Sequence, residues 1–526
     1  MTPAAPGVPG RAATGVSRSR VAHNAVLNFL GLAIPLGLAF FVMPIAARHL
    51  GAARFGLLGL AWAVTEYLTL FDLGLGRALV KFVADALHHD SADLNEIVSL
   101  SIIVQVAAGL VGGAAFVLAA PLLVHNVFRI PPGTASEAVG TFRIVGMSVP
   151  VVLLMSAQRA VLEGAQRFDL SATTKMASSI LSLSIPAIGA VYGASLPSIM
   201  LVLLMSRVLI SIVYAFAIRA ALPHLRWLTT RDWGLIRRIL SFGGWVFVSN
   251  TISPLLVYFD RFALGTIVGL AAVGFYTAPY EGVTRMLLVP VALIGTLLPA
   301  LTSIEARAER VQFTELAASA ERILMAAMAM PLALVFVFAP ELLRVWLGAQ
   351  YAANSATALR LLVVGVFANA LAQPLLVMLY AKNRPDLPAK FHLLELAIHV
   401  PLTIILIRAF GITGAAIAWT TRVMLDATLL SLAAARTSNA SIFQIMGGRM
   451  AQAALSASAL LAGLVGSRSL TSMSPTAAAI GVLATMIAFA LLSWSWILRE
   501  QERAAIRGIL RSYLTPLTGM PRPISR

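Results

Sequence analysis

The chain has 526 residues, of which 59% are hydrophobic and 12% are charged, and it carries a formal net charge of +17 with a mean hydropathy of +0.87. A soluble domain has about twice that charged fraction, so the composition excludes an ordinary globular enzyme. The basic residues are spread over short loops instead of forming one patch, which argues against nucleic acid, and the absence of cysteine excludes disulfides and thiolate metal sites.

Apolar runs of roughly 20 residues recur along the chain, and each is long enough to cross a bilayer core. They predict an all-α polytopic membrane protein with about fourteen spans. The predicted spans are residues 26–47, 55–76, 98–124, 144–162, 172–191, 198–222, 241–265, 271–299, 323–345, 358–380, 393–407, 414–434, 451–465 and 477–497. Between them, residues 81–96 read as a polar segment and residues 125–143 as the longest outer connection.

The spans divide into two groups of six with a final pair. We expect, in chain order, a flexible cytoplasmic tail at 1–22, an N-lobe at 23–222, a basic cytoplasmic linker at 223–239, a C-lobe at 240–436, two further helices within 437–498 and a basic, amphipathic cytoplasmic tail at 499–526. Lysine and arginine favour one set of alternate loops by roughly three to one, which predicts that both termini are cytoplasmic.

The two groups of six repeat one another. Gly51-Ala-Ala-Arg-Phe-Gly56 matches Gly269-Leu-Ala-Ala-Val-Gly274, Gln166-Arg167 matches Asn383-Arg384, and Ser206-Arg207-Val208 matches Thr421-Arg422-Val423. The offsets are 218, 217 and 215 residues, from the residue numbers. An even number of helices per copy inserts both copies the same way round, which predicts two lobes related by a pseudo-twofold axis along the membrane normal.

Several motifs resemble the polysaccharide and oligosaccharide flippases, a Wzx-like branch of the multidrug, oligosaccharidyl-lipid and polysaccharide exporter superfamily. They are Ser241-Phe-Gly-Gly-Trp245, Tyr258-Phe-Asp-Arg-Phe262, Val273-Gly-Phe-Tyr-Thr-Ala-Pro-Tyr-Glu281 and Glu163-Gly-Ala-Gln-Arg-Phe168. The resemblance covers about residues 24–497. It implies a cationic central cavity, alternating access and a bacterial inner-membrane location. It also implies export of an undecaprenyl-pyrophosphate-linked oligosaccharide to the outer leaflet, with a polysaccharide polymerase and glycosyltransferases as partners besides membrane lipids.

Charged residues inside the predicted spans are the candidate binding residues, because a lipid-facing helix should carry none. Asp260 and Arg261 are matched to the cavity by the resemblance. As neighbours on a helix they project about 100° apart, so they are not expected to pair simply with each other. The alternative is a snorkelling pair near the end of the helix at Gly265.

Other candidates come in pairs four residues apart on one helix face. Glu281 with Arg285 and Arg422 with Asp426 fit either a binding role or self-neutralised pairs that orient a helix. Arg207 has no acid at that spacing, which favours a cavity role. Asn250 is a further candidate for binding the substrate in the cavity.

A coupling ion is not evident from the sequence. Glu66, deep in its span, is the candidate for ion coupling, while Asp72 near the span's end fits a cap. Glu395 and His399 fit a packing pair. His88, His89 and Asp90 fit a solvated loop, so we expect no metal site and no cofactor.

Three hypotheses follow. The first is a flippase for a lipid-linked oligosaccharide, and the second is a cation-coupled multidrug or metabolite exporter of the same fold. A membrane enzyme, such as a glycan polymerase, is the third. The chain has no phosphate-cradling glycine loop and no nucleophile–base arrangement, so we expect no enzyme activity.

Overall fold

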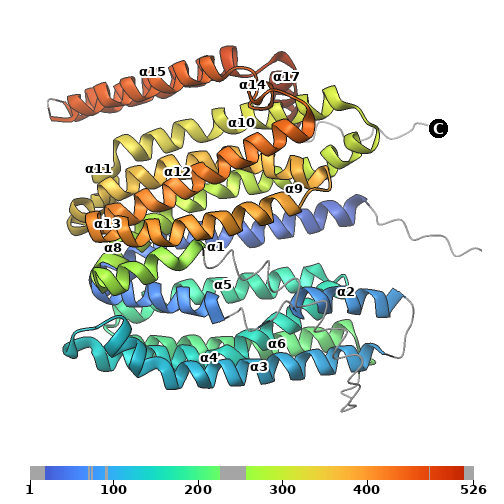
Figure 1. The fold of residues 1–526 in the computed structure, drawn as a ribbon, viewed down its shortest axis with the longest axis vertical. Coiled ribbons are helices and arrows are strands. Elements are labelled where there is room, and N and C mark those ends of the chain that lie inside the picture. Colours follow the sequence, from blue (N-terminus) through green and yellow to red (C-terminus); the bar gives the residue numbers. More distant parts are fainter. Residues whose placement is uncertain are drawn as a thin grey trace, which may run out of the picture.

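The computed structural model describes residues 18–68, 72, 75–88, 93–225, 256–472 and 474–514. The described part is helical throughout its length, with short connections and no β-strand (Figure 1). This follows from the apolar sequence, because inside a bilayer each backbone N–H and C=O has to be satisfied within its own segment. Large apolar side chains such as Leu118, Val111 and Phe216 are mostly exposed on the outside of the helices, as a lipid-facing surface requires.

The first half forms one bundle of helices, called here the first bundle. Its elements are α1 (Arg18–Leu68), α2 (Leu75–His88), α3 (Leu94–Leu122), a π-helical turn (Leu123–Val127), α4 (Pro132–Gly164), α5 (Phe168–Val191) and α6 (Leu196–Ala221). Helix α4 packs against α2, α3 and α6, and α5 packs against α1 and α6.

The second half forms a second bundle. It contains helical residues 256–267, α8 (Leu270–Thr284), a 3-10 turn (Arg285–Leu287), α9 (Leu288–Ala306), α10 (Arg310–Val337), α11 (Ala339–Trp346), α12 (Ala349–Ala381) and α13 (Asp386–Ser438). Helix α12 lies at its centre, in contact with α8, α9, α10, α11 and α13. The short α14 (Ile442–Ile445) leads to an accessory pair, α15 (Met450–Ser469) and α16 (Pro475–Leu492), of which α15 packs on α10. A π-helical turn (Ser493–Ile497) and α17 (Glu500–Leu514) follow.

The repeat inferred from the sequence is visible in the backbone. Gly51 and Gly269 both have positive φ, at 73° and 121°, and Gln166 and Asn383 have φ values of 58° and 56°. A further matched pair, Gly193 and Gly411, has φ values of 68° and 57°. The chain therefore makes the same left-handed turns at equivalent positions in both halves. Gly51 and Gly269 lie close together, since Ala52 meets Gly274 and Leu270 meets Gly56. We call the end of the molecule at which α8 and α11 lie the glycine end; α14 and α17 lie at the opposite end (Figure 1).

Ten helices in the described residues are long and apolar enough to cross a membrane. Helix α13 has 53 residues and bends at Gly411, so it holds two of the predicted spans, and the 51-residue α1 bends in the same way at Gly51. The all-α membrane fold is thus confirmed. The total of about fourteen spans and the lobe boundaries remain predictions, because most of the linker and residues 226–255 lie outside the described residues.

Three local expectations were wrong. Helix α1 begins at Arg18, so the end of the tail expected at 1–22 is already helical. Helix α2 extends to His88 and buries Val83 and Ala86, where a polar segment was expected. Helix α4 begins at Pro132, within the expected connection 125–143. Helices α2 and α4 pack against each other and against α3, and this packing orders stretches too polar or too short to be recognised as spans.

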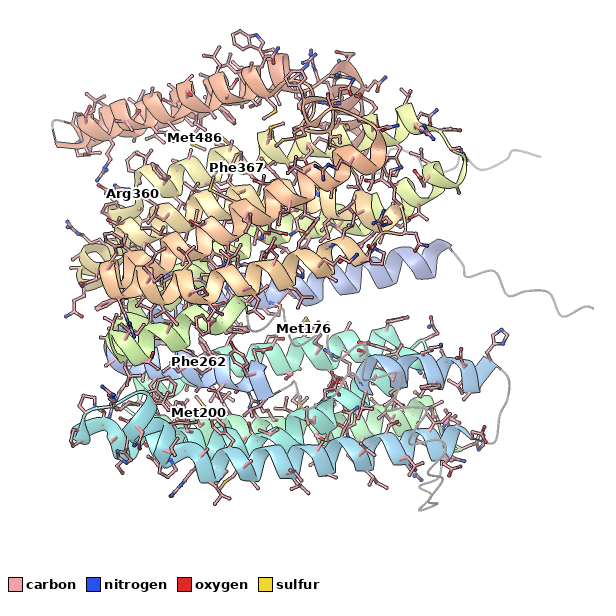
Figure 2. The ribbon with its side chains drawn as sticks, viewed as in Figure 1. Met176, Met200, Phe262, Arg360, Phe367 and Met486 are labelled. Carbon is pink, nitrogen blue, oxygen red and sulfur yellow. The ribbon has the colours of Figure 1, made fainter. Side chains whose placement is uncertain are left out.

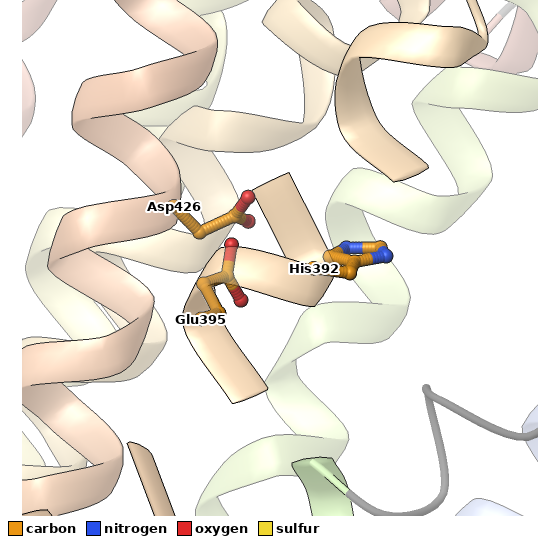
Figure 3. Close-up of side chains that lie close together, drawn as sticks. All are labelled: His392, Glu395 and Asp426. Atoms are coloured by element: carbon orange, nitrogen blue, oxygen red, sulfur yellow. The ribbon is translucent and has the colours of Figure 1, made fainter. Parts of the chain in front are cut away.

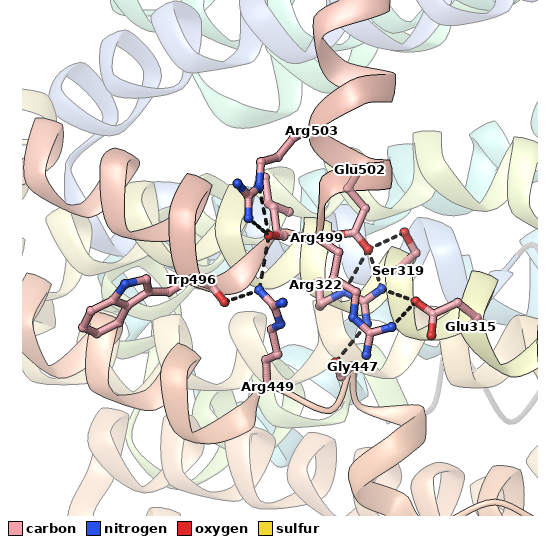
Figure 4. A network of polar contacts seen from close by, with 10 residues as sticks. Glu315, Ser319, Arg322, Gly447, Arg449, Trp496, Arg499, Glu502 and Arg503 are labelled. Atoms are coloured by element: carbon pink, nitrogen blue, oxygen red, sulfur yellow. Dashed lines mark hydrogen bonds and ion pairs between the residues drawn. The ribbon is translucent and has the colours of Figure 1, made fainter.

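A buried charge network joins the C-terminal helix to the second bundle (Figure 4). Arg322 of α10 is fully buried and donates from Nε to Glu502 Oε1 at 2.8 Å, from Nη1 to the carbonyl of Gly447 at 2.9 Å and from Nη2 to Glu315 at 2.7 Å. Glu502 also accepts from Ser319 Oγ at 2.8 Å and from the Arg499 backbone N–H at 2.7 Å. The network fixes where α17 begins.

Candidate functional site

The centre of the candidate site is Arg261, on the helical residues 256–267 of the second bundle. Its side chain is 1% exposed, and its Nη2 donates to Glu281 Oε1 on α8 at 2.6 Å. The rings of Tyr258 and Tyr280 each lie 4.9 Å from its guanidinium carbon, within the range of a cation–π contact. A guanidinium so enclosed is held in place, and the snorkelling alternative is wrong because the side chain does not reach the surface.

Asp260 has its own partners, as the 100° separation predicts. Its Oδ1 accepts the backbone N–H of Arg261 at 2.7 Å, and its Oδ2 accepts the hydroxyl of Tyr276 on α8. Asp260 is completely buried. Asp260 and Arg261 therefore both bind residues of α8, and they fix the packing of the two helices through charge-assisted hydrogen bonds.

Glu281 forms ion pairs with two arginines, Arg261 and Arg285. Its second oxygen, Oε2, lies 3.5 Å from Nη2 of Arg285, so the predicted pair on one helix face is formed, although it is the longer of the two contacts. Side chains of Glu281 and Arg285 are each about a quarter exposed, at 25% and 26%. The helix is interrupted here, because α8 ends at Thr284 and residues Arg285–Leu287 form a 3-10 turn. Irregular backbone at membrane depth is typical of substrate sites.

The first bundle contributes Glu66 from α1 and Arg207 from α6. Arg207 donates from Nη1 to the hydroxyl of Ser148 on α4 at 2.9 Å. Glu66 lies within electrostatic range of Arg207 and, across the bundles, of Arg261 and Glu281. The structure therefore brings together residues that are more than 200 positions apart in the sequence.

Arg422 does not form its expected pair with Asp426. Its Nη1 instead donates to Glu395 Oε2 at 3.2 Å, across the bend of α13. The expected pair of Glu395 with His399 is not formed either, since the His399 ring contacts the hydroxyl of Thr403 and lies edge-on to Phe259 at 6.5 Å. Both errors have one cause: spacing along a helix says nothing about the helix packed against it.

Glu395, the partner of Arg422, also belongs to a cluster that the sequence did not predict. Its other members are His392 and Asp426 (Figure 3). One ligand atom from each of His392, Glu395 and Asp426 lies within 4.8 Å of the other two. Glu395 is completely buried, and the other two side chains are half-buried. These three side chains could hold a cation. The sequence offered only the isolated residues, up to 34 positions apart.

The two bundles meet through aromatic side chains that sequence reasoning missed. Phe262 of the second bundle, labelled in Figure 2, packs against Tyr67 of α1, with ring centroids 4.9 Å apart, and against Phe128 at 6.1 Å. Nearer the glycine end, Trp346 of α11 donates to the carbonyl of Phe40 on α1 at 2.8 Å and stacks on its ring. Aromatic side chains that carry one polar atom, such as tyrosine and tryptophan, are typical of such contacts. They can be assigned to a contact only when the helix that faces them is known.

The charge of the site differs from the cationic cavity that the resemblance implies. Its described members comprise four arginines and five carboxylates: Arg207, Arg261, Arg285, Arg422, Glu66, Asp260, Glu281, Glu395 and Asp426. The arginines are mostly neutralised by these acids. Asn250 lies outside the described residues, so its role remains a prediction.

A family model described as "Polysaccharide biosynthesis protein" matches residues 21–305, more than half of the chain. The chain belongs to the polysaccharide biosynthesis protein family. The matched region of this family member includes the first bundle from residue 21 onward and the segment with Arg261, Glu281 and Arg285. The resemblance inferred from the sequence motifs is thereby confirmed.

Two kinds of similar protein agree with this assignment. A putative O-antigen transporter of Shigella flexneri is 30% identical over 418 residues, which are 78% of this chain and 96% of that protein. Among solved structures, the lipid II flippase MurJ in an inward closed conformation aligns with a TM-score of 0.68 at 15% identity over 92% of this chain and 100% of MurJ. An inward-facing multidrug resistance MATE family transporter aligns with a TM-score of 0.67 at 14% identity over 79% and 98%. At these identities the two structures show the fold alone.

Proposed function

We propose that the chain is a flippase that moves a lipid-linked oligosaccharide, carried on undecaprenyl pyrophosphate, from the cytoplasmic to the outer leaflet. The observation that carries the proposal is Arg261, a buried arginine fixed by Glu281 where the two bundles meet. Buried charge inside a membrane is costly and is generally retained for a transport pathway. The 30% identical relative, named as an O-antigen transporter, supports a saccharide substrate.

The proposed step is alternating access between the two bundles. Rigid bundles that rock about a central site give access to each leaflet in turn, and the repeat supplies two such bodies. An inside-negative membrane potential favours the outward movement of about two negative charges by roughly 4–5 kcal/mol per 100 mV. The potential alone can therefore drive a diphosphate-bearing lipid outward.

The location and partners follow from the same proposal. The protein is placed in the bacterial inner membrane with both termini cytoplasmic, as the lysine and arginine distribution favours. The glycine end then faces outward. Glycosyltransferases would build the lipid-linked intermediate before the flippase acts. A polysaccharide polymerase would use it afterwards.

The test is complementation of a deletion strain, with surface polysaccharide and the cytoplasmic lipid-linked intermediate both measured. We expect Arg261→Ala to abolish surface polysaccharide and to accumulate the intermediate, and Arg261→Lys to restore little because lysine cannot reproduce the planar contacts. Arg384→Ala is the matched control, since Arg384 is half-exposed and pairs with Asp386 away from the site. Full activity of Arg261→Ala at normal protein levels would rule out its proposed role.

A cation-coupled exporter is the second candidate function. The His392–Glu395–Asp426 cluster favours it, together with Glu66, because coupling ions bind buried carboxylates. The fold is shared with a MATE family transporter. Ion-dependent efflux and drug resistance in whole cells, with unchanged surface polysaccharide after deletion, would favour this function over the first.

A further inference from the structure

The two contacts of Glu281 are unequal. Its carboxylate lies 2.6 Å from Arg261 and 3.5 Å from Arg285. The first is a short charge-assisted hydrogen bond, whereas the second is at the limit of one. The stronger contact is also the hidden one, since Arg261 is 1% exposed and Arg285 is 26% exposed. Of these two arginines, an incoming anion can therefore reach only Arg285.

The two arginines also differ in what else holds them. Arg261 is enclosed by Glu281 and by the rings of Tyr258 and Tyr280. Arg285 has Glu281 as its ion-pair partner, at the longer distance. The Nε of each arginine is buried without a hydrogen-bond partner among the described residues, and an unpaired guanidinium N–H costs free energy. Only Arg285 also has part of its side chain exposed, so it is the arginine with unused capacity that an anion can reach.

The backbone places Arg285 differently from an ordinary helical residue. It opens the 3-10 turn between α8 and α9, the point at which the helix is interrupted. Interrupted helices of this kind commonly form the substrate sites of membrane transporters.

We propose that Glu281 is an internal counter-anion, which neutralises Arg285 in the empty site and is displaced from it by the diphosphate group of the substrate. This rests on the proposed function and names which arginine receives the substrate. Glu281 keeps its short contact to Arg261 throughout. Arg285 is thus paired in both the empty and the loaded state, which avoids an uncompensated charge inside the membrane.

Diphosphate replaces Glu281 at Arg285 when the substrate binds, and Glu281 returns to Arg285 when the substrate leaves. A diphosphate offers more charge and more acceptor oxygens to the guanidinium fork than one carboxylate oxygen 3.5 Å away. The competing carboxylate then limits affinity and allows release at the outer leaflet. In this arrangement Arg261 is a positioning residue, because it acts through Glu281.

The proposal gives a result of unusual sign: removal of an acidic charge should tighten anion binding. The test uses the full-length protein in lipid nanodiscs and titration calorimetry with inorganic diphosphate. Glu281→Gln keeps the shape of the side chain and weakens the competition, so we expect diphosphate to bind about tenfold tighter, a change of about 1.4 kcal/mol. Arg285→Gln should abolish binding, and the double variant should resemble Arg285→Gln.

Two controls separate this effect from a general loss of negative charge or of structure. Glu305→Gln removes an acid that pairs with Lys382 at the far end of α9, and it should leave diphosphate affinity unchanged. Thermal melting of each variant shows whether it folds. Unchanged or weaker binding by a folded Glu281→Gln protein overturns the proposal, as does normal binding by Arg285→Gln.

Transport measurements keep this proposal distinct from the proposed function. We expect the Glu281→Gln protein to bind diphosphate more tightly yet deliver less polysaccharide to the surface, since release slows. If wild-type protein fails to complement the deletion while the calorimetry gives the expected order, the flippase assignment fails and the anion site stands. If complementation succeeds and the calorimetric order is not found, only the counter-anion role is lost.

Discussion

Gly56 of α1 and Gly274 of α8 lie against each other, and neither position has room for a β-carbon. A β-carbon on Gly56 would overlap the carbonyl oxygen of Leu270, and one on Gly274 would overlap that of Ala52. Ala52 and Leu270 are themselves 218 positions apart, the same offset as the two glycines. The contact is therefore symmetric, and the pseudo-twofold relation passes between the two glycines.

This contact predicts a strong effect of a single methyl group. Gly56→Ala should destabilise the protein by roughly 1–3 kcal/mol, because overpacking at a backbone contact forces the helices apart. The melting temperature of purified protein in detergent measures the effect. Gly37→Ala is the control, since a β-carbon there meets nothing within 4 Å, and it should leave the melting temperature unchanged or raise it. Equal melting temperatures for the two variants would contradict the close approach.

The ion pair of Arg422 and Glu395 predicts that a double variant is more stable than the single Arg422 variant. Arg422→Gln leaves the fully buried Glu395 without its cation, so we expect a loss of roughly 3–5 kcal/mol. Adding Glu395→Gln removes the stranded charge and should recover part of that loss. A double-variant cycle measured by melting tests the coupling. Additive effects would mean that the pair does not interact.

The network around Arg322 predicts how the C-terminal helix is attached. Glu502→Gln removes the charge from a buried carboxylate that accepts from Arg322, Ser319 and the Arg499 backbone. We expect a loss of about 1.5–3 kcal/mol, the range for hydrogen bonds to charged groups. Glu500→Gln, whose side chain is 69% exposed, is the control and should have little effect. Susceptibility of α17 to limited proteolysis gives the readout, and no difference between the variants would argue against the network.

The same carboxylate predicts a pH dependence for α17. Burial alone would raise the pKa of Glu502, but hydrogen bonds from Arg322, the Arg499 backbone and Ser319 outweigh it and lower that pKa below its ordinary value. A lowered pKa contributes stability that is complete above the ordinary carboxyl pKa and is lost as the pH falls through the folded value. We therefore expect α17 to detach as the pH falls below about 4.

Spin labels can follow this detachment directly, because the chain has no cysteine of its own. Labels on Gln312→Cys and Gln501→Cys, both exposed positions, report the separation of α10 and α17. The separation should broaden on acidification in the wild-type background and already be broad at neutral pH with Glu502→Gln. A distance that stays fixed down to pH 3 would show that the carboxylate does not hold the helix.

The sequence by itself determined the class of the protein and its internal repeat. Apolar length is enough to recognise a membrane helix, since a bilayer forces each segment to satisfy its own backbone. The repeat is readable because left-handed turns need glycine or asparagine at fixed places, as at Gly51 with Gly269 and at Asn383. Motifs such as Tyr258-Phe-Asp-Arg-Phe262 were enough to predict the family.

Only the tertiary structure decided which charges meet. Arg261 pairs with Glu281 on another helix. Arg422 pairs with Glu395, although Asp426 is nearer to it in the sequence. Side-chain spacing within one helix predicts neighbours on that helix, whereas a buried ion inside a membrane takes whichever partner the adjoining helix presents. That choice depends on how the helices are rotated against one another. The rotation is set by contacts such as Gly56 against Gly274, between residues 218 positions apart in the sequence.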